Sequence, residues 1–161
     1  MARDTLEQQL LDILYATQTE QRSVLELLDE QHDAMIQRDL TRLSALATSL
    51  VSRAESLQKL EQQRATTIQQ LNDAPQGQGD QPTLQEIADR ATSPAHRTEM
   101  LALRERLLDT QALVSEARDR NQILASHVLE ANDATLRNLM DALRESGERP
   151  DDRPRVLDRR A

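Results

Sequence analysis

Residues 94–146 of the chain read PAHRTEMLALRERLLDTQALVSEARDRNQILASHVLEANDATLRNLMDALRES, a run without glycine and with proline only at its first position. Its apolar side chains recur at intervals of three and four residues, which is the spacing of one face of a helix. Ser93 and Pro94 offer an N-cap followed by proline at the first helical position. The run therefore predicts a long helix over 94–145 and favours an all-α fold.

The apolar positions of this helix form two consecutive stripes. The first contains Met100, Leu103, Leu107, Val114, Ala117, Leu124 and Val128, and the polar Asn121 interrupts it. The second lies on a somewhat shifted face, as expected of a straight helix, and contains Leu129, Leu136, Leu139, Met140 and Leu143. A helix of this length spans roughly 80 Å, whereas a helix of about 32 residues spans roughly 50 Å. We therefore expect part of its apolar face to have no cover within the chain.

Residues 1–74 also contain neither glycine nor proline. Asp4 and Glu7 have the spacing of a capping box, which predicts a first helix over 5–36. A cleaner heptad follows and predicts a second helix over 40–72, with Asp39 as its N-cap. The alternative is one continuous helix of about 68 residues. We favour a break because a hairpin lets the two apolar stripes bury against each other.

Glycine and proline gather in the window NDAPQGQGDQPT, which predicts a flexible linker over 73–82. Thr83 and Glu86 then form a second potential capping box, which predicts a short helix over 84–91. The charged, proline-containing segment 146–161 is predicted to be a disordered tail.

These segments together predict an all-α protein. The expected architecture is an elongated, antiparallel, coiled-coil-like bundle of three long helices plus one short linker helix. It forms a single helical domain over 1–145.

Composition narrows the class of protein. The chain of 161 residues has no Phe, Trp or Cys and a net charge of −8, with Lys59 as its only lysine. This charge argues against binding of nucleic acid, which needs a concentrated basic surface. No secretory signal opens the sequence, and no apolar run approaches the ~20 residues that span a bilayer. We expect a cytoplasmic protein without stable membrane insertion.

Catalytic and metal-binding patterns do not assemble in the sequence. Without cysteine there is no thiol nucleophile and no thiolate ligand. The three histidines, His32, His96 and His127, lack the Glu-x-x-His spacing of a di-metal helical bundle. We therefore expect no catalytic residue, no metal site, no cofactor and no enzymatic activity.

Three segments resemble the FlgN-type flagellar export chaperones. They are AMIQRDLTRLSAL (34–46), SLQKLEQQR (56–64) and DRNQILASHVLEANDATLRNLMDAL (119–143), and TLQEIA (83–88) sits where the family has a short linker helix. Leucine-rich helices resemble one another, so the order and spacing of the segments carry the likeness. It covers residues 5–143.

The resemblance implies a chaperone of the hook-filament junction proteins, hook-associated proteins 1 and 3. Such a chaperone binds the C-terminal helical region of its clients, prevents their premature assembly, and delivers them to the export gate and the export ATPase. The family's client-binding region maps onto Asn121, Leu124, Val128, Leu129, Leu136, Leu139, Met140 and Leu143.

The main alternative is a generic coiled-coil scaffold, in which the same apolar face mediates homo-oligomerisation. The residues alone leave open whether the chain is a monomer or a homodimer. The residues alone also leave open that the apolar side chains from Leu124 to Leu143 simply belong to the hydrophobic core.

Overall fold

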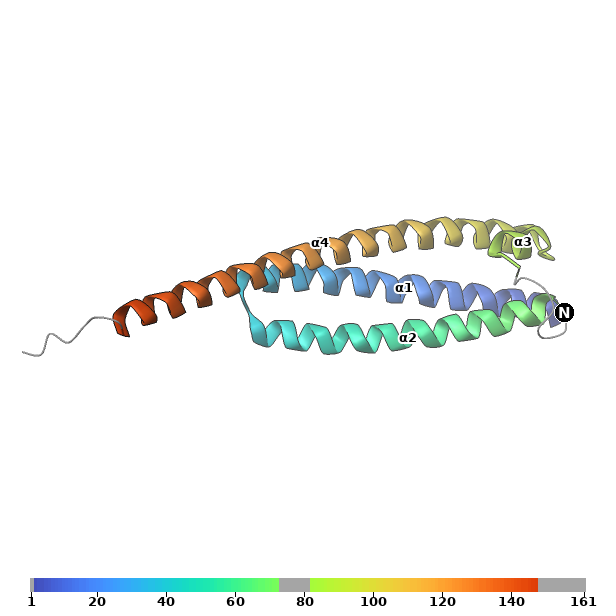
Figure 1. Cartoon of the computed structure of the whole chain (residues 1–161). Helices are drawn as coiled ribbons and strands as arrows, with labels where there is room; N and C mark the ends of the chain where they lie inside the picture. The colour runs from blue at the N-terminus through green and yellow to red at the C-terminus, as the bar shows by residue number, and fades with distance from the viewer. Residues whose placement is uncertain (1, 73–81, 148–161) are drawn as a thin grey trace, which may run out of the picture. The chain divides into compact units, whose positions relative to one another are not determined.

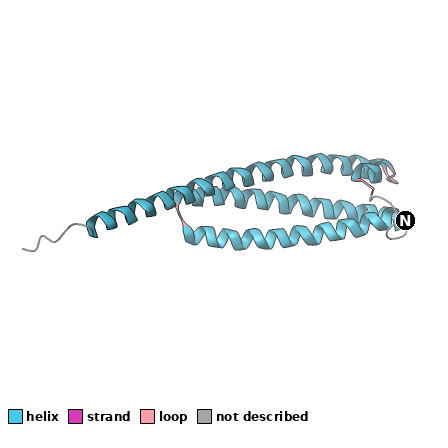
Figure 2. Cartoon of the chain, in the orientation of Figure 1, coloured by secondary structure: helices cyan, strands magenta, loops and turns pink. Residues whose placement is uncertain are grey.

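The computed structural model describes residues 2–72 and 82–147, which contain four helices and no strand (Figures 1 and 2). The helices are α1 (Ala2–Gln37), α2 (Leu40–Asn72), α3 (Leu84–Asp89) and α4 (Pro94–Gly147). The largest difference from the predicted bounds is at the start of α1, which begins at Ala2 rather than at residue 5. The all-α prediction is confirmed.

The chain divides into two units, residues 1–122 and residues 123–161, and the boundary falls within α4. The first unit contains α1, α2, α3 and the first part of α4. The second contains the remainder of α4. The predicted flexible linker over 73–82 and the predicted disordered tail over 146–161 lie almost wholly outside the described residues.

A two-residue turn joins α1 to α2 without glycine. Arg38 takes a left-handed backbone conformation with φ of 56°. Its N–H donates to Met35 O at 3.2 Å, and the N–H of Asp39 donates to Ala34 O at 2.9 Å. This pair of bonds is a Schellman motif, which usually has glycine in the left-handed position. Asp39 then caps α2, because its Oδ1 accepts from the N–H of Arg42 at 2.9 Å. The predicted break and cap are confirmed.

The other predicted helix starts have different outcomes. Thr83 and Glu86 form the capping box that opens α3. The backbone and side-chain hydrogen bonds from Thr83 hold the pKa of Glu86 below its usual value. Ser93 caps α4, since its Oγ accepts from the N–H of Ala95 at 3.2 Å. The box predicted for Asp4 and Glu7 is wrong, because α1 already begins at Ala2 and Glu7 is buried at 1% exposure.

Three long helical segments of the first unit pack side by side. Within this unit α1 and α2 are antiparallel, and the first part of α4 runs parallel to α1 (Figure 1). The main core cluster draws on all four helices: Leu10, Leu11 and Leu14 from α1, Ile68 and Leu71 from α2, Ile87 and Ala88 from α3, and Met100 and Leu103 from α4. The short helix predicted as a linker element therefore contributes two fully buried side chains to the core.

Polar contacts fix α4 and the residues just before it against α1 within the first unit. The Thr92 N–H donates to Glu7 Oε1 at 2.9 Å, and the Thr92 hydroxyl donates to Glu7 Oε2 at 2.8 Å. His96 Nδ1 lies 3.0 Å from the same Oε2. Burial by itself would raise the pKa of Glu7, but the hydrogen bonds from His96 and Thr92 outweigh it and lower the pKa. Further along, Asn121 Nδ2 donates to Leu28 O at 2.7 Å.

Because Glu7 is buried and hydrogen-bonded, Glu7→Gln should lower the free energy of unfolding by about 1–3 kcal/mol. The amide nitrogen of glutamine is a hydrogen-bond donor. One of the two Thr92 donors would therefore face another donor in place of a carboxylate oxygen. Urea denaturation followed by circular dichroism measures the change. Glu20→Gln is the matched control, because Glu20 pairs with Arg53 at 3.1 Å across a partly exposed surface. The control should cost less than about 1 kcal/mol. If both variants lowered the free energy of unfolding by the same amount, the buried hydrogen bonds of Glu7 would contribute no more to stability than a surface ion pair.

Candidate functional site

The second unit presents large apolar side chains to solvent. Every residue from Leu129 to Glu145 is exposed. The exposed fractions are 65% for Leu129, 59% for Leu136, 55% for Leu139, 54% for Met140 and 59% for Leu143. A lone exposed leucine is common on a protein surface, but a helix segment with five large exposed apolar residues is not. We call these five side chains the C-terminal apolar face.

The helix geometry gathers these side chains on one side. At about 100° per residue, the C-terminal apolar face covers only about 100° of the helix circumference. The charged side chains between Glu130 and Glu145 fall on the other side: Glu130, Asp133, Arg137, Asp141, Arg144 and Glu145. The segment is therefore strongly amphipathic. Acidic residues and arginines are mixed on its charged side. An apolar helix from a partner fits such a face through burial of leucine and methionine side chains.

The structure separates the predicted client-binding residues into three groups. Leu129, Leu136, Leu139, Met140 and Leu143 form the C-terminal apolar face. Leu124 and Val128 are half-buried. Asn121 is only 5% exposed, and its amide donates to Leu28 O and, at 3.1 Å, to Gln31 Oε1. Asn121 therefore holds α4 to α1 in the first unit, and we leave it out of the proposed surface.

Sequence reasoning missed a polar cluster in the first unit. Asp4, Glu7 and His96 come together between the starts of α1 and α4. One signal was available, because Glu7 lies one heptad before Leu14 and so falls on the buried face of α1. The partner could not be found from spacing, because His96 is 89 residues away in the sequence.

No described helix, in residues 2–72 or 82–147, is long and apolar enough to cross a membrane. The helical bundle and the exposed amphipathic segment of α4 define a class of protein, an all-helical protein with an unusually apolar exposed helix face. The sequence matches the FlgN protein family over residues 1–148. This chain belongs to that family, whose members are flagellar export chaperones rather than enzymes. Comparison with curated proteins and with solved structures finds no match.

Proposed function

We propose that this chain is a flagellar type III export chaperone for the hook-filament junction proteins. Its C-terminal apolar face binds the C-terminal helical region of these clients and prevents their premature assembly. The observation that carries the proposal is the exposure of five large apolar residues on one side of an amphipathic helix. The family membership supports the chaperone role in general.

The size of the face suits a reversible complex. Full burial of a leucine or methionine side chain gains about 1.5–3 kcal/mol, so covering the exposed half of five of them gains roughly 4–8 kcal/mol. A matching apolar face on the client gains a similar amount. Association itself costs about 4–15 kcal/mol, which leaves a moderate affinity. Methionine and leucine without aromatic anchors also favour an adaptable contact over a very tight one.

Reversibility matters because the client must be handed over. In this proposal the chaperone works in the cytoplasm and delivers its client to the export gate and the export ATPase. No bond is made or broken, so the function needs only a surface that competes with self-assembly of the client. Clients that polymerise through terminal helices expose an apolar surface before assembly, and this surface is what the chaperone helix covers.

Analytical ultracentrifugation tests the proposal against the scaffold alternative. Sedimentation of the pure chain gives its own mass in solution, which is the reference for the next measurement. Addition of a C-terminal helical fragment from a hook-filament junction protein should produce a new species containing both chains. A central fragment of the same client, with the terminal helices removed, is the control and should not bind. Self-association of the chain at micromolar concentration, with no shift on addition of the client fragment, would support the scaffold and contradict the chaperone.

A further inference from the structure

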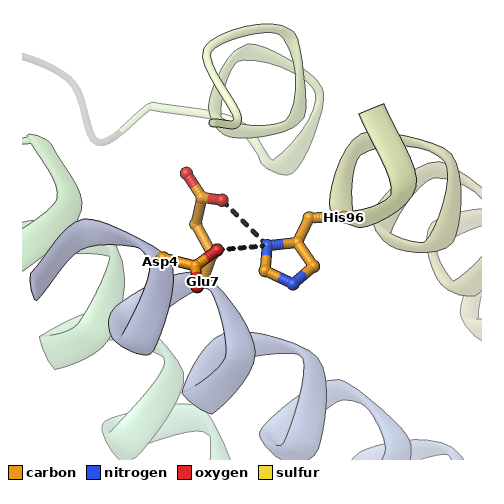
Figure 3. Close-up of side chains that lie close together, drawn as sticks. All are labelled: Asp4, Glu7 and His96. Carbon is orange, nitrogen blue, oxygen red and sulfur yellow. Dashed lines mark hydrogen bonds and ion pairs between the residues drawn. The ribbon is translucent and has the colours of Figure 1, made fainter. Parts of the chain in front are cut away.

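The starts of α1 and α4 bring two carboxylates and one imidazole together, all within the first unit (Figure 3). His96 Nδ1 lies 3.0 Å from Glu7 Oε2 and 3.5 Å from Asp4 Oδ1. One ligand atom from each residue falls within 4.8 Å of the others. Asp4 and Glu7 share a face of α1 because they are three residues apart, and His96 reaches them from the first turn of α4.

The surroundings orient the central carboxylate. Glu7 is 1% exposed, and Thr92 donates both its N–H and its hydroxyl to it. The Arg3 guanidinium lies 3.4 Å from Oε1, whereas Oε2 accepts from the Thr92 hydroxyl and also faces the imidazole. Hydrogen bonds that fix a ligand in this way are typical of the groups around a metal site. Asp4, in contrast, has a side chain 63% exposed and can rotate toward an ion.

His96 Nδ1 faces a carboxylate oxygen from each of two residues, and it is within hydrogen-bond distance only of Glu7 Oε2. A cation placed between the three atoms would contact all of them.

The ligand types indicate which cation. Imidazole nitrogen with carboxylate oxygen suits zinc and similar divalent transition metals, whereas magnesium and calcium prefer oxygen ligands alone. Zinc bonds of about 2.0–2.1 Å in a tetrahedron place the ligand atoms roughly 3.3 Å apart. The distances from His96 Nδ1 to the two carboxylate oxygens, 3.0 and 3.5 Å, lie on either side of that value, and one oxygen of each carboxylate lies within 4.8 Å of the other.

We propose that Asp4, Glu7 and His96 form a binding site for a divalent transition metal of the zinc type. Three protein ligands leave a fourth position for water. Because the site joins two segments 89 residues apart, the bound ion fastens the first turn of α4 to α1. This inference is independent of the client-binding proposal, and its test uses no client.

Isothermal titration calorimetry of the full, tag-free chain with zinc chloride tests the site, with magnesium chloride as the comparison ion. We expect one zinc per chain and no measurable heat with magnesium. Zinc at ten times its dissociation constant should also raise the melting temperature of the chain, because an ion that binds only the folded state stabilises it. Absence of saturable zinc binding to the unmodified chain would overturn the proposal.

Three variants assign the ligands. His96→Gln should abolish zinc binding and the zinc-dependent rise in melting temperature. Asp4→Asn changes an exposed side chain, so it should leave the melting temperature without zinc unchanged and weaken zinc binding at least about tenfold. His127→Gln removes an exposed histidine of α4 outside the cluster and should bind zinc like the unmodified chain.

Zinc binding that survives in His96→Gln would place the ion elsewhere and overturn the assignment. If His96→Gln fails to fold, Asp4→Asn decides, and unchanged affinity in that variant contradicts the site. If the three residues only form an ion pair and bind no metal, titration of zinc into any of the chains will give no heat of binding, and the proposal is overturned.

Discussion

The double variant Leu136→Ser, Leu139→Ser should lose binding of a junction-protein C-terminal fragment while its fold remains nearly intact. Both leucines are more than half exposed, so their replacement removes little buried apolar area from the folded chain. Each leucine would become buried in the complex. Loss of two central contacts of a docking face costs several kcal/mol, which weakens binding at least about a hundredfold. The melting temperature should fall by no more than a few degrees.

A matched control is available on the other side of the same helix segment. Arg137→Ser, Asp141→Ser introduces the same two serines, leaves the net charge unchanged and removes no apolar side chain. Both double variants lower helix propensity by less than about 1 kcal/mol, so a large difference in client affinity comes from the apolar face. Fluorescence anisotropy of a labelled client fragment measures affinity, and circular dichroism measures melting. Unchanged binding in the leucine variant would defeat the site assignment. A collapsed fold would return Leu136 and Leu139 to the core.

Most of the fold could be predicted from the sequence because few segments break its helices. The absence of glycine and proline over 95–146, after the Ser93–Pro94 start signal, predicted α4 almost to its ends. The turn between α1 and α2 was harder, because the left-handed position belongs to Arg38. An arginine there has no sequence signal comparable to glycine. The break was predicted instead from the need to bury two stripes, and from Asp39 as a cap.

Glu7 shows why local motifs can mislead. The spacing from Asp4 to Glu7 matched a capping box, which is a local signal. The observed partners of Glu7 are Thr92 and His96, and no local rule predicts a contact over 85 residues or more. Burial of a carboxylate requires such partners, because an unpaired buried charge is very costly. Leu14, one heptad after Glu7, was a signal for its burial that the sequence interpretation missed, and only the fold identified the groups that hydrogen-bond to Glu7.

Asn121 shows that the client-binding residues, too, could be predicted only in part from sequence spacing. The spacing of three and four residues in α4 runs through Asn121 and on to Leu143 with only a gradual shift of face, so spacing alone could not show where burial ends. In the structure Asn121 is 5% exposed and hydrogen-bonded to α1, whereas the residues from Leu129 onward are exposed. The equally spaced positions therefore include one buried residue, Asn121, two half-buried residues, Leu124 and Val128, and the five exposed residues of the C-terminal apolar face.

Replacing Leu103 by alanine should have the opposite consequence to the serine variant. Leu103 is 0% exposed and packs in the core cluster that unites all four helices. Truncation of a fully buried leucine costs about 2–5 kcal/mol, because it removes apolar burial and leaves a cavity. For a chain of this size the melting temperature should fall by roughly 5–15 °C. Measured well below that temperature, client binding should stay within about threefold of the unmodified chain, because Leu103 is not on the C-terminal apolar face.

The best control is a leucine of the same helix with the same substitution. Leu136→Ala lowers exposed rather than buried apolar area, and alanine is an excellent helix former, so the free energy of unfolding should change by less than about 0.5 kcal/mol. Its client affinity should nevertheless fall. The two variants thus separate stability from binding along one helix: one loses stability and keeps its client, and the other keeps stability and loses affinity. If Leu103→Ala and Leu136→Ala destabilised the chain equally, α4 would bury both leucines, and the division between core and client surface would be wrong.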